Sequence, residues 1–239
     1  MEFLDYGLAN LALLATMFVG SHFFLSHPPV RKFLIHRWRM GTFRIVYSII
    51  AIVLFLMMYS AYTAAPSVAL NLPALTLVPL VVMPFAAILI FCGYTIVNPS
   101  AFATENGNYG QAVPGILKIT RQPAMWGVGL FALSHMAANP DAAAWIFFGA
   151  LALEALVGGY FLDRRKKIER QPGWQQLVEQ SSFIPFLAIV SGRARVTPGQ
   201  IGWWRILGGL ALSAGLVLAH QALIGVAPLP ADWMAKILM

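Results

Sequence analysis

Long apolar runs separated by short polar gaps make up most of the sequence. A helix needs about 20 apolar residues to cross the hydrocarbon core of a bilayer. Stretches that approach this length cover residues 6–25, 45–65, 75–97, 123–138, 142–162 and 206–226. The pattern predicts an all-α fold, a polytopic membrane helix bundle of about six transmembrane helices, which forms a single domain over residues 1–239.

Prolines and one aspartate mark breaks in this pattern. Pro79 and Pro84 fall in the third run, where each removes a backbone donor and predicts a kink. The fourth and fifth runs are separated only by residues 139–141, and Asp141 is a natural N-cap for the fifth. These two runs therefore predict a tight helical hairpin. The fourth run is short, and a start near Val113 is the alternative.

Lys and Arg residues alternate with the runs. Of the 16, all but Lys236 lie in the gaps after the first, third and fifth runs or beside the sixth, whereas residues 66–73 and 139–141 contain none. Because basic loops stay in the cytoplasm, both termini are predicted to be periplasmic. Residues 1–5 include two acidic residues and no Lys or Arg, so the first run is expected to be a retained span rather than a signal peptide.

Composition supports the lipid bilayer as the surrounding medium. The chain is 59% hydrophobic and 10% charged, against roughly 25% charged residues in soluble domains. The net charge of +7 does not indicate nucleic acid, because the basic residues lie in short gaps and form no nucleic-acid-binding module. Cys92 is the single cysteine, which excludes a disulfide or a cysteine metal cluster within one chain.

Ionisable side chains inside the runs are the candidate functional residues, because such groups are costly in hydrocarbon. They are His22, His135, Glu154 and His220. A neutral imidazole can bind haem iron through one nitrogen while the other donates to a carbonyl. A histidine hydrogen-bonded to a neighbouring helix is the structural alternative. For Glu154, a buried hydrogen bond and a catalytic role are both open.

The depth of the histidines limits which of them share one iron. The first run descends toward the basic side and the fourth ascends from it. At 1.5 Å per residue, His22 and His135 differ in depth by several Å up to about 10 Å, part of which helix tilt absorbs. His135 and His220 both lie toward the other side, so His220 is a reserve candidate for a metal ligand.

Several motifs resemble those of the NnrU family. Gly20-Ser21-His22 is similar to the family's opening. Residues 118–123 (Lys-Ile-Thr-Arg-Gln-Pro) and 134–141 (Ser-His-Met-Ala-Ala-Asn-Pro-Asp) resemble its Arg-His-Pro and His-Leu-Leu-Ala-Asn-Gly-Asp signatures. Asp163-Arg164-Arg165, residues 182–186 and His220 follow in the family's order. The resemblance covers nearly the whole chain.

The resemblance implies a cofactor. The family includes the plant and cyanobacterial 15-cis-zeta-carotene isomerases, which implies a membrane-embedded haem b held at the motif positions His22 and His135. Two positions depart from the family pattern: Gln122 replaces the histidine of Arg-His-Pro, and Pro140 replaces the glycine of Asn-Gly-Asp. Both departures weaken the transfer of an isomerase activity.

The NnrU branch is associated with bacterial denitrification. We therefore expect a multi-pass protein of the bacterial inner membrane that binds haem b and has an accessory role in nitrite or nitric oxide reduction, with nitrogen-oxide respiratory proteins as partners. One alternative is a haem-dependent cis-trans isomerase of zeta-carotene or a related polyene, with an apolar lipid or polyene as substrate. The other is a cofactor-free membrane scaffold.

Overall fold

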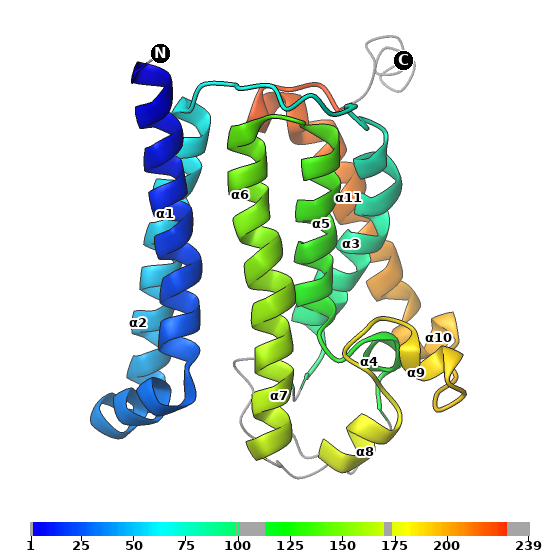
Figure 1. Cartoon of the computed structure of the whole chain (residues 1–239). Helices are drawn as coiled ribbons and strands as arrows, with labels where there is room; N and C mark the ends of the chain where they lie inside the picture. The colour runs from blue at the N-terminus through cyan, green and yellow to red at the C-terminus, as the bar shows by residue number, and fades with distance from the viewer. Residues whose placement is uncertain (1, 99, 101–112, 170–173, 229–239) are drawn as a thin grey trace.

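The computed structural model is a bundle of long helices joined by short connections (Figure 1). It describes residues 2–98, 100, 113–169 and 174–228. Arg170 and Lys236, which the charge pattern assigned to opposite sides, lie outside the described residues. The only extended pairing in the described part is a single bridge between Ala69 and Asp141. The predicted all-α membrane bundle is therefore confirmed.

Five helical stretches of the described chain are long and apolar enough to cross a membrane. They are α1 (Glu2–Ser26), α2 (Pro28–Ala64), α3 (Val78–Thr95), the continuous run formed by α6 (Ala142–Leu153), the π-helical turn η1 (Glu154–Gly158) and α7 (Gly159–Glu169), and α11 (Trp203–Ile224). Pro79 lies in the first turn of α3, where no backbone donor is needed, so only Pro84 is internal.

The fourth expected span is the helix α5 (Pro123–Ala138). Its 16 residues rise about 24 Å, less than the hydrocarbon thickness of about 30 Å. The alternative start near Val113 is wrong, because α4 (Gly115–Ile119) is a separate helix. Thr120 follows it with an extended backbone (φ −154°, ψ 143°) and breaks the helical path. Figure 1 shows α5 inside the bundle, between α6 and α3.

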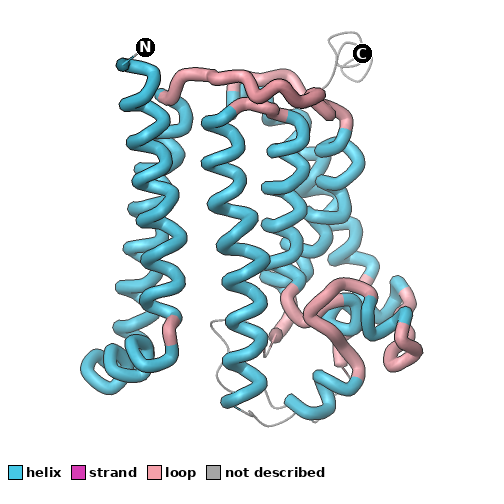
Figure 2. Tube along the Cα trace, viewed as in Figure 1, coloured by secondary structure: helices cyan, strands magenta, loops and turns pink. Residues whose placement is uncertain are grey.

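One end of the bundle carries few charges, and we call it the neutral end. Asp141 caps α6 there by accepting a hydrogen bond from the Ala144 amide (3.0 Å), which confirms the predicted tight hairpin of α5 and α6. The connection from α2 to α3 crosses this end as an extended segment, visible along the top of Figure 2. It is held to the hairpin by Leu70 N–H to the Pro140 carbonyl (2.8 Å) and Ala142 N–H to the Val68 carbonyl (2.9 Å).

The opposite end, here called the basic end, holds Arg31, Arg121, Arg165 and Arg205. Helix α2 bends there at Arg39, whose φ of 65° is not helical. The short helices α8 (Trp174–Glu179), α9 (Leu187–Val190) and α10 (Pro198–Ile201) also lie at this end (Figure 1). The α1–α2 hairpin packs on the rest of the bundle through α6, and its buried core includes Leu11, Phe18, Met58 and Phe147.

Candidate functional site

A large cavity lies between the α1–α2 hairpin and the α6–η1–α7 helix, toward the basic end. Its volume is about 990 Å³, at the upper end of the roughly 300–1,000 Å³ of small-molecule sites. Most of its wall is apolar, formed by side chains such as Phe18, Phe23, Val128, Leu151 and Phe161. We call it the His22 cavity.

His22 lies in the wall of this cavity with a fixed ring orientation. Its Nδ1 is 2.7 Å from the Phe18 carbonyl oxygen. The ring packs on Phe18 (centroid distance 4.4 Å) and forms a T-shaped pair with the Tyr47 ring (5.3 Å), and the residue is only 9% exposed. A carbonyl can only accept, so Nδ1 carries the proton and Nε2 keeps a free lone pair. This is the arrangement of a histidine prepared to bind a metal.

Glu154 also lines the His22 cavity. It begins the π-helical turn η1 inside the long α6–α7 run, and such turns are frequent at functional sites. The carboxyl folds back over Gly158, since a Cβ there would lie 2.8 Å from Oε1. Its Oε2 is buried and has no hydrogen-bond partner among the described residues. The structure therefore leaves Glu154 with an unused acceptor at the cavity.

The opening of the cavity at the basic end is positively charged. Arg31, Lys32, Arg164 and Arg165 line it, and we call these four residues the basic mouth. Glu169 forms ion pairs with two of them: its Oε1 is 3.6 Å from Arg31 Nη1 and 3.5 Å from Arg165 Nε. Arg and Lys side chains of this kind can donate charge-assisted hydrogen bonds to acidic groups on a ligand.

His135 is not brought to the His22 cavity. Its Nδ1 is 2.8 Å from the Phe131 carbonyl oxygen, and its ring packs on Phe131 and Phe148. Phe148 lies six residues before Glu154, which is about 9 Å along the helix. A series of ring contacts lies between the two histidines, with centroid distances from 4.4 to 6.4 Å, through Phe18, Phe55, Phe147 and Phe148. The structure thus places His22 and His135 at different depths.

His220, the reserve candidate, belongs to the neutral end. Its Nδ1 is 2.7 Å from the Val226 carbonyl oxygen. Like His135, it is not among the residues that line the His22 cavity.

A polar cluster that sequence reasoning missed lies at the basic end. Arg121 donates from Nε and Nη2 to the two carboxylate oxygens of Asp163, at 2.7 Å each, and from Nη1 to the Ser181 carbonyl (3.2 Å). Both charged residues are buried. The signal was present in the family motifs at residues 118–123 and 163–165, but their spacing alone did not show that they pair.

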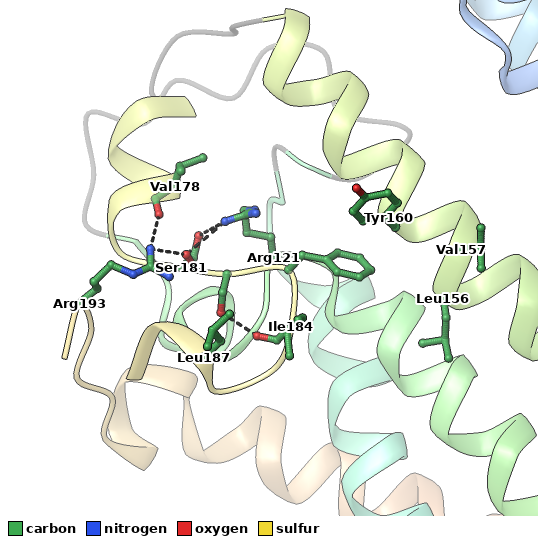
Figure 3. A pocket seen from close by; sticks show the side chains of 11 residues that line it. Arg121, Leu156, Val157, Tyr160, Val178, Ser181, Ile184, Leu187 and Arg193 are labelled. Atoms are coloured by element: carbon green, nitrogen blue, oxygen red, sulfur yellow. Dashed lines mark hydrogen bonds between the residues drawn. The ribbon is translucent and has the colours of Figure 1, made fainter. Parts of the chain in front are cut away.

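Figure 3 shows a second, smaller pocket beside this cluster, with a volume of about 540 Å³. Arg121 and Arg193 point toward Ser181 on one side, and Leu156, Val157 and Tyr160 come from the long helix on the other. Gln122 lies next to the cluster and lines neither the His22 cavity nor the smaller pocket. It is 2% exposed, and its side-chain amide donates to the Ser100 carbonyl (2.9 Å), so it acts as a structural residue.

Comparison with known proteins identifies a family. A family model described as NnrU protein matches residues 10–228, which is most of the chain. No curated protein and no solved structure matches the chain.

Proposed function

Because the chain belongs to the NnrU family, we propose that it is a haem-binding accessory protein of nitrogen-oxide respiration in the bacterial inner membrane. The observation that carries the proposal is His22, whose Nε2 is left free by the Phe18 carbonyl in the wall of a large apolar cavity.

The residues of the His22 cavity fit a b-type haem in three respects. His22 supplies one neutral imidazole nitrogen for iron. The aromatic and aliphatic walls match an apolar macrocycle, and the volume lies in the range of ligand sites. The basic mouth matches the two acid groups that haem carries. Of the two motif histidines only His22 lines the cavity, and His27 is the other histidine in its wall.

When bound, haem supplies a one-electron iron centre. The chain's own residues hold and shield that group. The Phe18 carbonyl fixes the tautomer of His22, and contact with the Tyr47 ring limits rotation of the imidazole. Arg31 and Arg165 at the mouth can donate charge-assisted hydrogen bonds to carboxylates. Phe18 and Phe23 keep water from the apolar part of the cavity.

Haem titration tests this assignment. Haemin added to the apoprotein in nanodiscs is expected to give a saturable Soret band at one haem per chain. We expect His22→Ala to abolish the band and the double variant R31Q/R165Q to weaken affinity about tenfold. His220→Ala is the matched control, because its Nδ1 is anchored in the same way outside the cavity. Equal Soret bands in wild type and His22→Ala would contradict the proposal.

The accessory role is tested in cells. In a denitrifying host that lacks this gene, nitrite or nitric oxide should accumulate under oxygen limitation. The wild-type gene should restore its consumption, and His22→Ala should not. Normal nitrogen-oxide consumption in the deletion strain would refute the accessory role, whereas the proposal of haem binding would be unaffected.

A polyene isomerase is the second candidate, and the long apolar wall of the His22 cavity favours it. Gln122 lies outside that cavity, so the departure from Arg-His-Pro does not alter the space where a polyene would lie. Expression in cells that accumulate tri-cis zeta-carotene tests this activity. An unchanged pigment excludes it for that substrate.

We also propose the orientation that the charge pattern predicts, with the basic end in the cytoplasm and both termini in the periplasm. Helix α1 begins and α11 ends at the neutral end (Figure 1). The start of α1 and the end of α11 therefore face the same side of the membrane, as the charge pattern requires. Alkaline phosphatase fused after Ile224 should be active, and fused after Glu169 it should be inactive.

A further inference from the structure

Residues 182–194 form a compact segment at the basic end, with one buried face and one exposed face. Ala188 is fully buried, and the Phe186 amide donates to the Ile119 carbonyl at the end of α4 (2.8 Å). The other face is apolar and open. Its exposed fractions are 54% for Ile184, 54% for Phe186, 46% for Leu187 and 83% for Val190.

The backbone amides in most of this segment are paired within the protein. Every N–H from Phe186 to Ala194 donates to an oxygen of the protein. Ser182 completes the set: its hydroxyl accepts from the Ala188 amide (3.0 Å) and donates to the Ile184 carbonyl (2.7 Å). An irregular loop in water has no need of such complete pairing, whereas a segment at the edge of hydrocarbon does, because unpaired amides are costly there.

The neighbours of the segment are typical of a membrane–water boundary. Trp203 and Trp204 begin the spanning helix α11 and are 63% and 55% exposed. Exposed tryptophans at the end of a spanning helix mark the headgroup level. Helix α10 packs on both α4 and α11, which holds the segment and the tryptophans at the same end of the bundle.

Basic side chains continue this surface. Arg193 is held by its Nη1, which donates to the Val178 (3.0 Å) and Ser181 (3.1 Å) carbonyls, and Arg195 is exposed. Acidic residues are absent from 182–195. A bare apolar face with basic neighbours complements a leaflet that contains anionic lipid.

We propose that Ile184, Phe186, Leu187 and Val190 enter the acyl–headgroup boundary of the leaflet at the basic end, with Arg193 and Arg195 among the anionic headgroups. The segment is then an interfacial anchor continuous with the lipid-facing surface of α11, rather than part of an aqueous loop. The pocket in Figure 3, which Ile184 and Leu187 help to line, lies at lipid level. This inference is independent of haem.

Spin-label accessibility in nanodiscs with one-third anionic lipid tests the anchor. A nitroxide at Val190→Cys is expected to be relaxed by oxygen at least threefold more than by a water-soluble nickel chelate. Gln175→Cys and Thr197→Cys, both exposed positions at the same end, should show the reverse. Cys92 is buried and does not compete for the label.

Each other outcome overturns the proposal. A label at Val190 that the nickel chelate reaches as readily as one at Gln175 would place the segment in water. A label that neither reagent reaches would mean that protein, not lipid, covers the face. Because Val190 is 83% exposed, the substitution should leave the melting temperature unchanged, which confirms that the labelled protein is folded.

Discussion

Two ionisable groups inside the bundle differ in how completely they are paired. Arg121 places its guanidinium on both carboxylate oxygens of Asp163 and on the Ser181 carbonyl. Glu154 keeps a buried carboxylate oxygen without a hydrogen-bond partner among the described residues. A buried polar group with all its hydrogen bonds stabilises the fold, whereas one without a partner lowers the free energy of unfolding. Residues that lower stability are concentrated at functional sites.

Replacing one member of the buried ion pair should be far worse than replacing both. Arg121→Met or Asp163→Leu leaves a buried charge without its partner, which costs about 3–5 kcal/mol. The double variant removes both charges and should recover most of this loss. Chemical denaturation in detergent gives the free energy of unfolding of the wild type, the two single variants and the double variant. Strictly additive single effects would show that the pair does not interact.

Removing the carboxyl of Glu154 should stabilise the protein. Glu154→Leu fills the same region of the cavity wall and removes an unsatisfied group, so we expect unfolding to become harder by about 1–3 kcal/mol. Glu154→Gln is the matched control, because it keeps a buried polar group and should change stability less. A loss of stability in Glu154→Leu would indicate that the carboxyl has a partner.

At the scale of helices, the sequence was informative where apolar length and chain breakers determine the outcome. The α5–α6 hairpin follows from residues 139–141 and the Asp141 cap, which are local. The bend at Arg39 and the π-helical turn at Glu154 could not be predicted, because neither has a proline or glycine at its start. Both depend on how the helices pack against each other.

The packing of α5 against α3 should tolerate little added volume. A Cβ at Gly127 would lie 2.6 Å from Ile90 Cγ1 and 2.7 Å from the Ala86 carbonyl oxygen. Gly127→Ala should therefore destabilise the fold by about 1–3 kcal/mol through overpacking. At Gly149 the nearest atom would be 4.0 Å away, so Gly149→Ala should be neutral or stabilising. Equal melting temperatures for the two variants would contradict this contact.

At the scale of the whole molecule, the candidate site exists because two parts of the bundle diverge. The α1–α2 hairpin packs on α6 near the neutral end, through residues such as Leu11 and Phe147. Toward the basic end the His22 cavity lies between the hairpin and α7. The sequence identified His22 and His135 as candidate ligands, and among the described residues it grouped Arg31, Arg121, Arg165 and Arg205 at one end. It could not show that His22 lines the cavity and His135 does not, because the depth of a residue in the packed bundle is a tertiary property.

The visible spectrum of the protein isolated from haem-replete cells is the most direct test of the His22 cavity. We expect a Soret band with sharp α and β bands after reduction by dithionite, lost in His22→Ala and retained in His135→Ala. A colourless wild-type protein that takes up no haem on reconstitution would contradict haem binding and favour a cofactor-free scaffold. A band lost equally in His135→Ala would contradict the assignment of the iron to the His22 cavity.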